Sequence, residues 1–515
     1  MNKVRDVMKE YVEALKERKE EARTQSGQSK RQQKGGHSAR ERIEMLADEG
    51  SFMELGSLAH SSVSGMESRT PADGLIGGLI TVDGREAVVQ ALDASVLSGT
   101  EGAVHLKKSE YFHQYARKRK LPLFNLCEGG GLRMPDGMGA DGISDKLFPS
   151  CLLDHCRETP ILTAILGESY GGPTWMAVTS DFVSQVRGAG MAVAGPRMLE
   201  MASGEKMTAE ELGGPDMHAD HTGQIDHIAA NEQEAIQALK DFFSYLPSHA
   251  GVEPERLHSS TEEQDQRVLE SLVPANGRRP YNMNAVLEVI FDDHSYMAFR
   301  PFYGKALLTG LARLNGRVVG VVASQPQHMA GSPGPKECDK AVDFICLCDA
   351  YHIPLIFLHD TPGFRISSNA EKDKMPGKIM NWNTALAKST VPKYAVVLRK
   401  SIGAAYGNMC GPGMGGDVVV AWPSAEINFT GPEVGINVVY GRKLQDAENP
   451  DEARAELLEQ WAFDSSPYQA AGNFLIEDVI EPKQTRAFLH RFLESAHAAG
   501  ELRSERRLAD WPMSF

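Results

Sequence analysis

Short apolar runs alternate with longer amphipathic stretches from about residue 77 onward. Four runs have the form of buried strands, each followed by Gly, Asp or Glu: residues 79–82, 87–92, 123–127 and 161–166. Three stretches between and after them fit helices: residues 111–119, 139–156 and 181–194. This alternation predicts an α/β fold with a largely parallel or spiralling sheet that helices cover.

The first forty residues follow another pattern. Acidic and basic residues alternate at helical spacing over residues 4–23, and the polar residues 24–36 come next. Ser38, a capping-type residue, then precedes apolar positions at helical spacing up to Leu46. We therefore expect a charged helix, a linker and a short helix that leads into the first domain.

One passage of the chain occurs twice. Residues 78–85 recur as residues 310–317, which places the copies 232 positions apart. Two further blocks recur at the same offset: residues 122–133 as 354–365, and residues 169–172 as 401–404. Three blocks at one offset predict two similarly folded halves that arose by internal duplication, and glycines that end equivalent strands then belong to sites of the same kind.

Length and composition agree with two domains. The 515 residues allow about 250 residues for each half, enough for a full core. The polar residues 249–266 form the natural linker between the halves. We expect an N-terminal helix and linker over residues 1–38, a first domain over 39–260 and a second over 261–515.

Charge and cysteine usage narrow the class of protein. The net charge of −15 argues against nucleic-acid or anionic-membrane binding, which needs a basic surface. Seven cysteines without a CxxC pair favour reduced thiols. Residues 1–23 have no apolar core or cleavage site, and no run is long enough to span a membrane. We expect a cytoplasmic enzyme, or one of the mitochondrial matrix in a eukaryote, although no transit peptide is visible.

Paired small residues follow one strand in each half. Gly171 and Gly172 precede a predicted helix, and so do Gly403, Ala404 and Ala405. Such residues leave consecutive backbone N–H groups uncovered beside a helix start, an arrangement that stabilises oxyanions. Simple tight turns are the alternative interpretation.

A companion loop follows an earlier strand in each half and begins with an acid. Gly129, Gly130 and Gly131 form the first, with Arg133 downstream, and residues 360–363 form the second. Glycine-rich loops with arginine can contact an anionic ligand, or the arginines can pair with nearby acids. Lys107 and Lys108 open a basic segment that suits a phosphorylated ligand such as coenzyme A, although a solvated helix face is the commoner meaning of such a run.

Other catalytic motifs are missing from the sequence. The residues His218, Asp220, His221 and His227 match no standard zinc spacing, so we expect no metal site. No GxSxG, Walker or HExxH motif occurs, which removes the common hydrolase, kinase and zinc-protease interpretations.

The chain resembles the carboxyltransferase (beta) subunits of biotin-dependent acyl-CoA carboxylases of the propionyl-CoA and methylcrotonyl-CoA type. The resemblance covers about residues 39–482, and its motifs are specific in combination. Five segments carry it: residues 39–43 with 50–55, residues 211–218, residues 325–331, residues 360–364, and residues 480–486.

The resemblance implies two tandem crotonase-like (ββα spiral) domains and a reaction with two oxyanion holes. An acyl-CoA enolate is expected at Gly171 and Gly172, and the oxygen of biotin at Gly403, Ala404 and Ala405. Biotin itself can take the substrate proton, so no side-chain base is required. Six residues of the glycine loop and the basic segment are expected to bind CoA: Gly129, Gly130, Gly131, Arg133, Lys107 and Lys108. Biotin contacts are expected from Thr361, Pro362, Gly363 and Phe364.

The resemblance also implies partners. Biotin is expected on a separate carrier, because this chain has no biotin-attachment motif of the Met-Lys-Met kind and no ATP-grasp signature. The partner is then a biotin carboxylase and carrier (alpha) subunit. A homo-oligomer, expected to be a hexamer, places each site between the N-half of one subunit and the C-half of another.

The acyl group and the direction of transfer stay open. Tyr406 and Gly407 stand where propionyl-type members carry Tyr-Asp, so Gly407 is the candidate specificity residue. Residues 375–382 depart from the usual family pattern. The alternatives are a decarboxylase alpha subunit, which passes carboxylate from an acyl-CoA to biotin, and an inactive scaffold that only binds CoA or a partner.

Overall fold

The computed structural model describes residues 2–24, 36–143, 156–257, 265–497 and 502–511. By packing, the chain divides into two compact units, residues 1–250 and 251–511 apart from the last residues. The polar stretch 249–266 spans this division. Leu257 already belongs to the second unit, because its N–H donates to the carbonyl of Gly316. The expected boundary at residue 260 lies among residues outside the described part and stays a prediction.

Unit 1 is built on an eight-stranded sheet in the order β1-β2-β3-β4-β5-β6-β8, with β7 paired to β5. Its strands are β1 Met53–Glu54, β2 Leu75–Val82, β3 Arg85–Leu92, β4 Leu123–Gly129, β5 Ile161–Tyr170, β6 Phe182–Val186, β7 Met191–Ala192 and β8 His227–Ala229. The β1-β2-β3 pairs are antiparallel, and the pairs from β3 onward are parallel.

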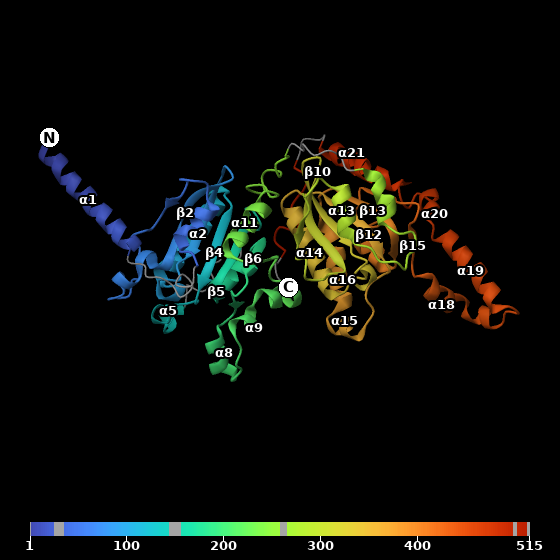
Figure 1. Cartoon of the computed structure of the whole chain (residues 1–515), viewed down its shortest axis with the longest axis horizontal. Helices are drawn as coiled ribbons and strands as arrows, with labels where there is room; N and C mark the ends of the chain where they lie inside the picture. The colour runs from blue at the N-terminus through green and yellow to red at the C-terminus, as the bar shows by residue number, and fades with distance from the viewer. Residues whose placement is uncertain (1, 25–35, 144–155, 258–264, 498–501, 512–515) are drawn as a thin grey trace. The chain divides into compact units, whose positions relative to one another are not determined.

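Helices precede, connect and follow the strands of unit 1 (Figure 1). The longer ones are α1 Asn2–Thr24, α2 Ala39–Leu46, α3 Ala103–Arg119, α8 Pro196–Ser203 and α11 Glu232–Phe243. The shorter ones are α4 Met134–Gly137, α5 Ala140–Ile143, α7 Gly172–Val178, α9 Ala209–Gly213 and α10 Pro215–Met217. The short helix predicted after the capping-type residue Ser38 is α2, and a capping box starts it, since Ser38 and Glu41 cap each other's N–H groups.

Unit 2 repeats the sheet in the order β16-β14-β13-β12-β11-β10-β9, with β15 paired to β13. Its strands are β9 Met297–Phe299, β10 Leu307–Leu314, β11 Arg317–Ser324, β12 Leu355–Thr361, β13 Lys393–Ile402, β14 Val418–Ala421, β15 Glu426–Asn428 and β16 Asp478–Val479. The strands β2 to β5 and β10 to β13 correspond at the offset of 232 residues found in the sequence. The predicted duplication is therefore present in the fold.

The helices of unit 2 are α12 Leu269–Leu272, α13 Met283–Ile290, α14 Pro335–Ala350, α15 Ser368–Lys372, α16 Met375–Lys388, α17 Ala404–Asn408, α18 Pro432–Gln445, α19 Pro450–Asp464, α20 Pro467–Gly472 and α21 Thr485–His497. Each unit has its own apolar core. In unit 1, Phe124 and Phe182 on the sheet meet Phe243 and Phe242 of α11, with ring centroids 5.3 and 4.3 Å apart. In unit 2, β10 to β14 bury Val, Leu and Ile side chains against α13 and α21.

One predicted helix is wrong. Residues 181–194 form β6 and β7, with every residue of β6 buried. A strand buried on both faces lacks strict polar alternation, so its pattern is not distinguished from that of a helix. Most of the helix predicted at residues 139–156 lies outside the described residues, and its described part contains α5. The helix predicted at residues 111–119 is the second half of α3.

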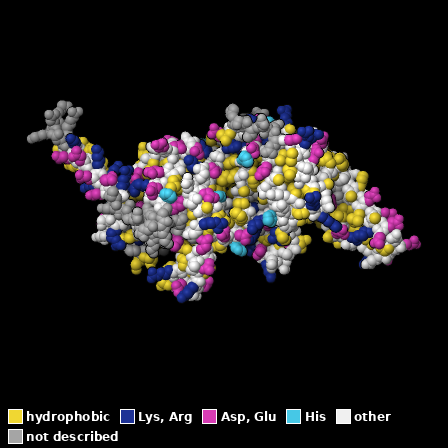
Figure 2. All heavy atoms as spheres, in the orientation of Figure 1, with side chains coloured by type: hydrophobic (Ala, Val, Ile, Leu, Met, Phe, Trp, Pro, Cys, Tyr) yellow, Lys and Arg dark blue, Asp and Glu magenta, His cyan; other side chains and the backbone are white. Residues whose placement is uncertain are grey.

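The predicted charged helix at the N-terminus is α1. Figure 2 shows acidic, basic and apolar side chains mixed along its surface. Five apolar side chains of the helix are exposed: Val7, Met8, Tyr11, Val12 and Leu15. Among the described residues, no helix has both the length and the apolar character needed to cross a membrane.

Candidate functional site

The first predicted oxyanion loop joins β5 to α7. Gly171 has a φ of 67°, a left-handed conformation that glycine adopts without strain. Its N–H donates to the carbonyl of Ala192 at 3.3 Å, so the pairing of β5 with β7 uses this donor. Gly172 is the first residue of α7, and its N–H makes no hydrogen bond within the described part of the chain. Gly172 is thus the free donor of the Gly171-Gly172 pair.

The second loop has the same backbone form. Gly403 also has a φ of 67°, and its N–H donates to the carbonyl of Asn428 at 2.9 Å. Ala404 begins α17 and is exposed. Neither Ala404 nor Ala405 has a hydrogen bond from its N–H to another described residue. These loops are therefore tight turns that also present free N–H donors. The tight-turn interpretation and the oxyanion-site interpretation do not exclude each other.

The loops differ by one donor. At the offset of 232 residues, Pro173 corresponds to Ala405, and proline has no N–H. Unit 2 thus presents two consecutive N–H groups after β13 without a hydrogen bond in the described chain, at Ala404 and Ala405, while in unit 1 Pro173 interrupts the run directly after Gly172. This difference is local, because the preceding glycines have the same φ and equivalent partners.

The companion loops lie directly against these donors. Gly129 pairs with Ser169 beyond a register shift in the β4–β5 ladder, and Thr361 pairs with Ser401 beyond the equivalent shift. A Cβ on Gly131 would lie 2.8 Å from the carbonyl oxygen of Tyr170, so only glycine fits there. Its N–H, like that of Gly172, has no hydrogen bond within the described residues. The structure therefore brings the GGG loop and the Gly171-Gly172 loop together.

Two of the residues expected to bind CoA have structural partners. The guanidinium of Arg133 is buried and contacts Asp73 at 2.7 Å and the carbonyl of Thr100 at 2.8 Å. The ammonium of Lys108 donates to the carbonyls of Gly56, Ala72 and Leu75, and burial lowers its pKa to about 8. Arg133 thus forms the pairing that the sequence left as an alternative. Contact of either side chain with CoA stays a prediction.

The remaining residues of that group are more accessible. Lys107 and Gly130 are exposed, whereas Gly129 is buried within β4. The N–H of Gly130 donates to the carbonyl of Ser98 at 3.0 Å, which fixes the loop on the turn before α3. A ligand on this loop would meet Gly130 and Lys107 rather than Arg133 and Lys108, whose cationic groups are already hydrogen-bonded.

The residues expected to contact biotin occupy the end of β12 and the loop after it. Thr361 is buried, Pro362 is exposed, and the ring of Phe364 meets the buried Trp382 of α16 at a centroid distance of 6.2 Å. Tyr406 of α17 packs edge-on to the buried ring of His359, at 6.1 Å. Burial lowers the pKa of His359 to about 4, so this ring is neutral at physiological pH.

Gly407 stands one residue after Tyr406 in α17. A Cβ at this position would make an ordinary contact, 3.7 Å, with Met414 Cγ. The space around Gly407 therefore accepts a small side chain, which makes a substitution there informative about the pocket.

Sequence reasoning missed Glu101, a buried acid next to the first loop. Its N–H donates to the carbonyl of Gly131 at 2.8 Å, and a Cβ on Gly172 would overlap its carboxyl group. At the offset of 232 residues its counterpart is Pro333. The sequence signal that could have identified Glu101 is this difference between the halves, because one turn carries an acid and the equivalent turn carries a proline.

Two other features lie apart from these loops. The ring of His218 is buried and contacts the carbonyl of Met191 at 2.7 Å and the hydroxyl of Thr222 at 3.0 Å. Within the described residues, no group of three or more His, Cys, Asp and Glu is placed to hold a metal ion.

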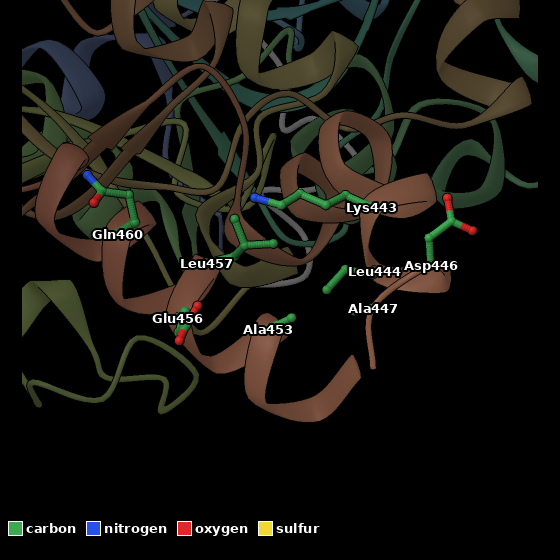
Figure 3. A pocket seen from close by; sticks show the side chains of 8 residues that line it. All are labelled: Lys443, Leu444, Asp446, Ala447, Ala453, Glu456, Leu457 and Gln460. Carbon is green, nitrogen blue, oxygen red and sulfur yellow. The ribbon is translucent and has the colours of Figure 1, made fainter. Parts of the chain in front are cut away.

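A hollow between α18 and α19 is the second of these features (Figure 3). Its lining consists of Lys443, Leu444, Asp446, Ala447, Ala453, Glu456, Leu457 and Gln460. None of these residues belongs to either oxyanion loop or either companion loop.

Comparison with known proteins identifies the family. The carboxyl transferase domain matches residues 30–508. The chain is 32% identical over 508 residues to a putative propionyl-CoA carboxylase beta chain of Bacillus subtilis, covering 97% of this chain and 98% of that protein. It is 33% identical over 462 residues to the methylmalonyl-CoA decarboxylase subunit alpha of Propionigenium modestum, covering 88% of each.

A solved structure agrees over nearly the whole chain. The transcarboxylase 12S crystal structure, described as a hexamer with methylmalonyl-coenzyme A and methylmalonic acid bound, aligns with a TM-score of 0.89 and 31% identity over 95% of both chains. The fold expected from the resemblance is thereby confirmed. The chain belongs to the carboxyl transferase domain family and is a carboxyltransferase made of two crotonase-like halves.

Proposed function

We propose that this chain moves a carboxyl group from carboxybiotin, carried on a separate protein, to the α- or γ-carbon of an acyl-CoA. The observation that carries the proposal is the pair of free N–H donors at equivalent strand ends, Gly172 in unit 1 and Ala404 in unit 2. The reaction produces negative charge on two different oxygens, one on each reactant. Two donor sites of the same kind match that requirement.

The acyl-CoA is assigned to unit 1. The N–H groups of Gly172 and Gly131 lie on adjoining loops, and both lack a partner in the described chain. They would hold the thioester oxygen as it becomes an enolate. Gly130 and Lys107 are the exposed members of the CoA-binding group and would face the rest of that ligand.

Biotin is assigned to unit 2, where the residues fit it. Carboxybiotin supplies the carboxyl group. Ala404 and Ala405 offer two adjacent donors for a urea-type oxygen, and the exposed Pro362 and half-buried Phe364 offer an apolar wall beside them. Gly403 suits the turn before these donors, because its φ is positive and a Cβ there would lie only 3.2 Å from the carbonyl oxygen of Phe429.

The glycine at position 407 is proposed to favour a branched or longer acyl group over propionyl. A glycine leaves free the space that an aspartate would fill and avoids placing a charge against an apolar chain.

The assembly is proposed to be a homo-oligomer, a hexamer by analogy with the transcarboxylase 12S structure. Each site would combine the N-half of one subunit with the C-half of its neighbour. The biotin carrier and the biotin carboxylase would be other chains, as the missing attachment and ATP-grasp motifs indicate.

The decarboxylase direction remains the second candidate, because the methylmalonyl-CoA decarboxylase subunit alpha is as similar as the carboxylase chains. Both directions use the same two donor sites. Copurification with an ATP-dependent biotin carboxylase would favour the carboxylase, and copurification with a membrane pump subunit would favour the decarboxylase.

The test uses the whole chain with free biotin as acceptor and a panel of ¹⁴C-carboxylated acyl-CoAs as donors, which includes methylmalonyl-CoA and a carboxylated branched five-carbon thioester. We expect transfer of label to biotin, followed in the opposite direction by carboxylation of a panel of acyl-CoAs once the biotinylated partner is added. Labelled CoA thioesters that bind without any transfer would instead support the inactive scaffold.

A further inference from the structure

Glu101 occupies an unusual position for an acid. It lies in the turn between the short 3-10 helix at Leu97–Gly99 and the start of α3, and its side chain is 4% exposed. Its backbone connects to the GGG loop in both directions: its N–H donates to the carbonyl of Gly131 at 2.8 Å, and its carbonyl accepts from the N–H of Arg133 at 2.8 Å. Its carboxyl group lies against Gly172, where a Cβ would overlap it.

The carboxyl group has no partner that would compensate a charge. Glu101 Oε1 is buried and makes no hydrogen bond with any described residue. The nearest ionisable group is His105 in α3, with Nε2 3.9 Å from Oε1. Burial lowers the pKa of His105 to about 3, so this ring is neutral. A buried carboxylate with no cation or donor is strongly unfavourable, and protonation relieves that cost.

Within the described residues, the other elements packed around Glu101 supply no free cation. From β4, the thiol of Cys127 is buried, its pKa raised by burial and then by Glu101 itself, and Glu128 is paired with Arg42. Arg133, from the companion loop, is paired with Asp73. Burial accordingly raises the pKa of Glu101 to about 7.

We propose that Glu101, as a neutral carboxylic acid, is a positioning residue of the acyl-CoA site. The inference rests on the proposed function of Gly172 and Gly131 as oxyanion donors. Through its backbone Glu101 fixes Gly131, and through its carboxyl group it fills the space beside Gly172, so the two donors keep their relative placement. The neutral form also keeps negative charge away from the oxygen that these donors stabilise.

The comparison of the halves supports this assignment. Unit 2 has Pro333 in the place of Glu101 and two free donors after β13, at Ala404 and Ala405. Unit 1 has Pro173 in place of the second donor, and Glu101 is the polar group that lies beside the remaining one. Where unit 1 has the proline Pro173, unit 2 has the N–H of Ala405. Where unit 2 has the proline Pro333, unit 1 has the acid Glu101.

The role predicts a dependence on pH with a definite sign. Below its pKa Glu101 is neutral and the site is competent. As the pH rises through about 7, the carboxylate forms beside Gly172 and opposes the negative charge on the thioester oxygen. Because its folded-state pKa is raised, ionisation also lowers the stability of the fold as the pH rises above the unfolded value.

The test compares wild type with Glu101→Gln, which cannot ionise, and uses transfer to free biotin from the carboxylated acyl-CoA of the panel that wild type uses best. We expect kcat of the wild type to fall by about tenfold between pH 6 and pH 9. Glu101→Gln should start severalfold below wild type at pH 6, because the amide places different atoms beside Gly172, and should keep that rate at pH 9. Glu86→Gln, an exposed acid on β3, is the matched control and should follow the wild-type profile.

A second measurement does not need activity. The Tm of Glu101→Gln should exceed that of wild type by about 5 °C at pH 8 and by much less at pH 5. Parallel pH profiles for the two proteins, or a Tm difference that does not change with pH, would overturn the inference while leaving the proposed function intact. No transfer by wild type from any donor of the panel would overturn the proposed function, and with it the positioning role, even where the Tm result shows a neutral Glu101.

Discussion

The two halves of this chain share a backbone and differ in the chemistry placed on it. The strand-end glycines Gly171 and Gly403 have the same φ, and each donates its N–H to a strand that pairs alongside. The residues around them differ, with Pro173 and Glu101 in unit 1 and Ala405 and Pro333 in unit 2. Duplication thus preserved the turn that uncovers a donor, and the groups beside it diverged toward two ligands.

The acids that begin the companion loops also occupy equivalent positions and have different surroundings in the two halves. Glu128 and Asp360 occupy equivalent strand ends, and both are buried and paired with arginine. Arg42 comes from α2, far away in sequence, whereas Arg399 comes from the neighbouring strand β13. The counterpart of Arg399 in unit 1 is Gly167, where a Cβ would overlap Glu128. Each half therefore neutralises the same acid by its own route.

The largest expected effect is on the unit 1 donor. Gly172→Val should lower kcat/KM by about 100- to 1000-fold, because its side chain would displace the Glu101 carboxyl group and move the free N–H. Initial rates of carboxyl transfer measure the effect, and circular dichroism checks the fold. Gly472→Val, at a glycine of α20 with open space around it, is the control and should keep full activity. Near-normal transfer by a folded Gly172→Val protein would remove this loop from the mechanism.

The next largest effect is on the stability of unit 2, where Arg399 neutralises the buried Asp360. Arg399 bonds Asp360 at 2.9 Å and the carbonyls of Pro274, Asn276 and Arg279. Arg399→Met leaves a buried acid unpaired, so it should lower the free energy of unfolding by about 3–5 kcal/mol. Urea titration followed by tryptophan fluorescence gives the value.

The control for that change is Arg187→Met, which removes the exposed pair with Asp216. It should leave the unfolding midpoint nearly unchanged, since an exposed pair contributes little. Equal midpoints for the two variants would mean that Asp360 does not depend on Arg399.

A smaller effect is expected at the acyl pocket. Gly407→Asp should shift the ratio of kcat/KM values toward propionyl-CoA, against a branched five-carbon acyl-CoA, by about tenfold, because the new side chain takes space near Met414. Competition between the two thioesters in one reaction measures the ratio. If the ratio does not move, another residue sets the choice of acyl group.

The smallest expected signal is the activity recovered when two inactive variants are mixed, which tests whether a site joins halves of different subunits. Gly172→Val and Ala404→Val chains should each be inactive, since every site carries a lesion. If a site joins the N-half of one subunit to the C-half of another, random mixing restores about a quarter of the sites. The two variants are dissociated, mixed and reassembled, and mass spectrometry verifies the mixed oligomers. The rate of carboxyl transfer then gives the fraction of restored sites. Mixed oligomers without recovered activity would place both donors of a site on the same chain.

The sequence alone determined the duplication, the sheet-and-helix alternation and the two donor loops. These features are local or periodic: a constant offset, short apolar runs and glycines at strand ends can be read without knowing what packs where. Gly171 and Gly403 were identified because small residues follow equivalent strands in both halves, and the structure gives both glycines a positive φ. The resemblance added the family, which the comparisons confirm.

Only the tertiary structure decided which side chains pair. The ammonium of Lys108 meets three carbonyls, Arg133 meets Asp73, and β6 replaces an expected helix, because burial on all sides overrides local pattern. Glu101 gives no signal in its own segment. Its meaning comes from the absence of a charged partner and from contact with Gly172, some seventy residues later in the chain. Interactions between residues so far apart depend on the fold, and a sequence pattern does not encode their distances.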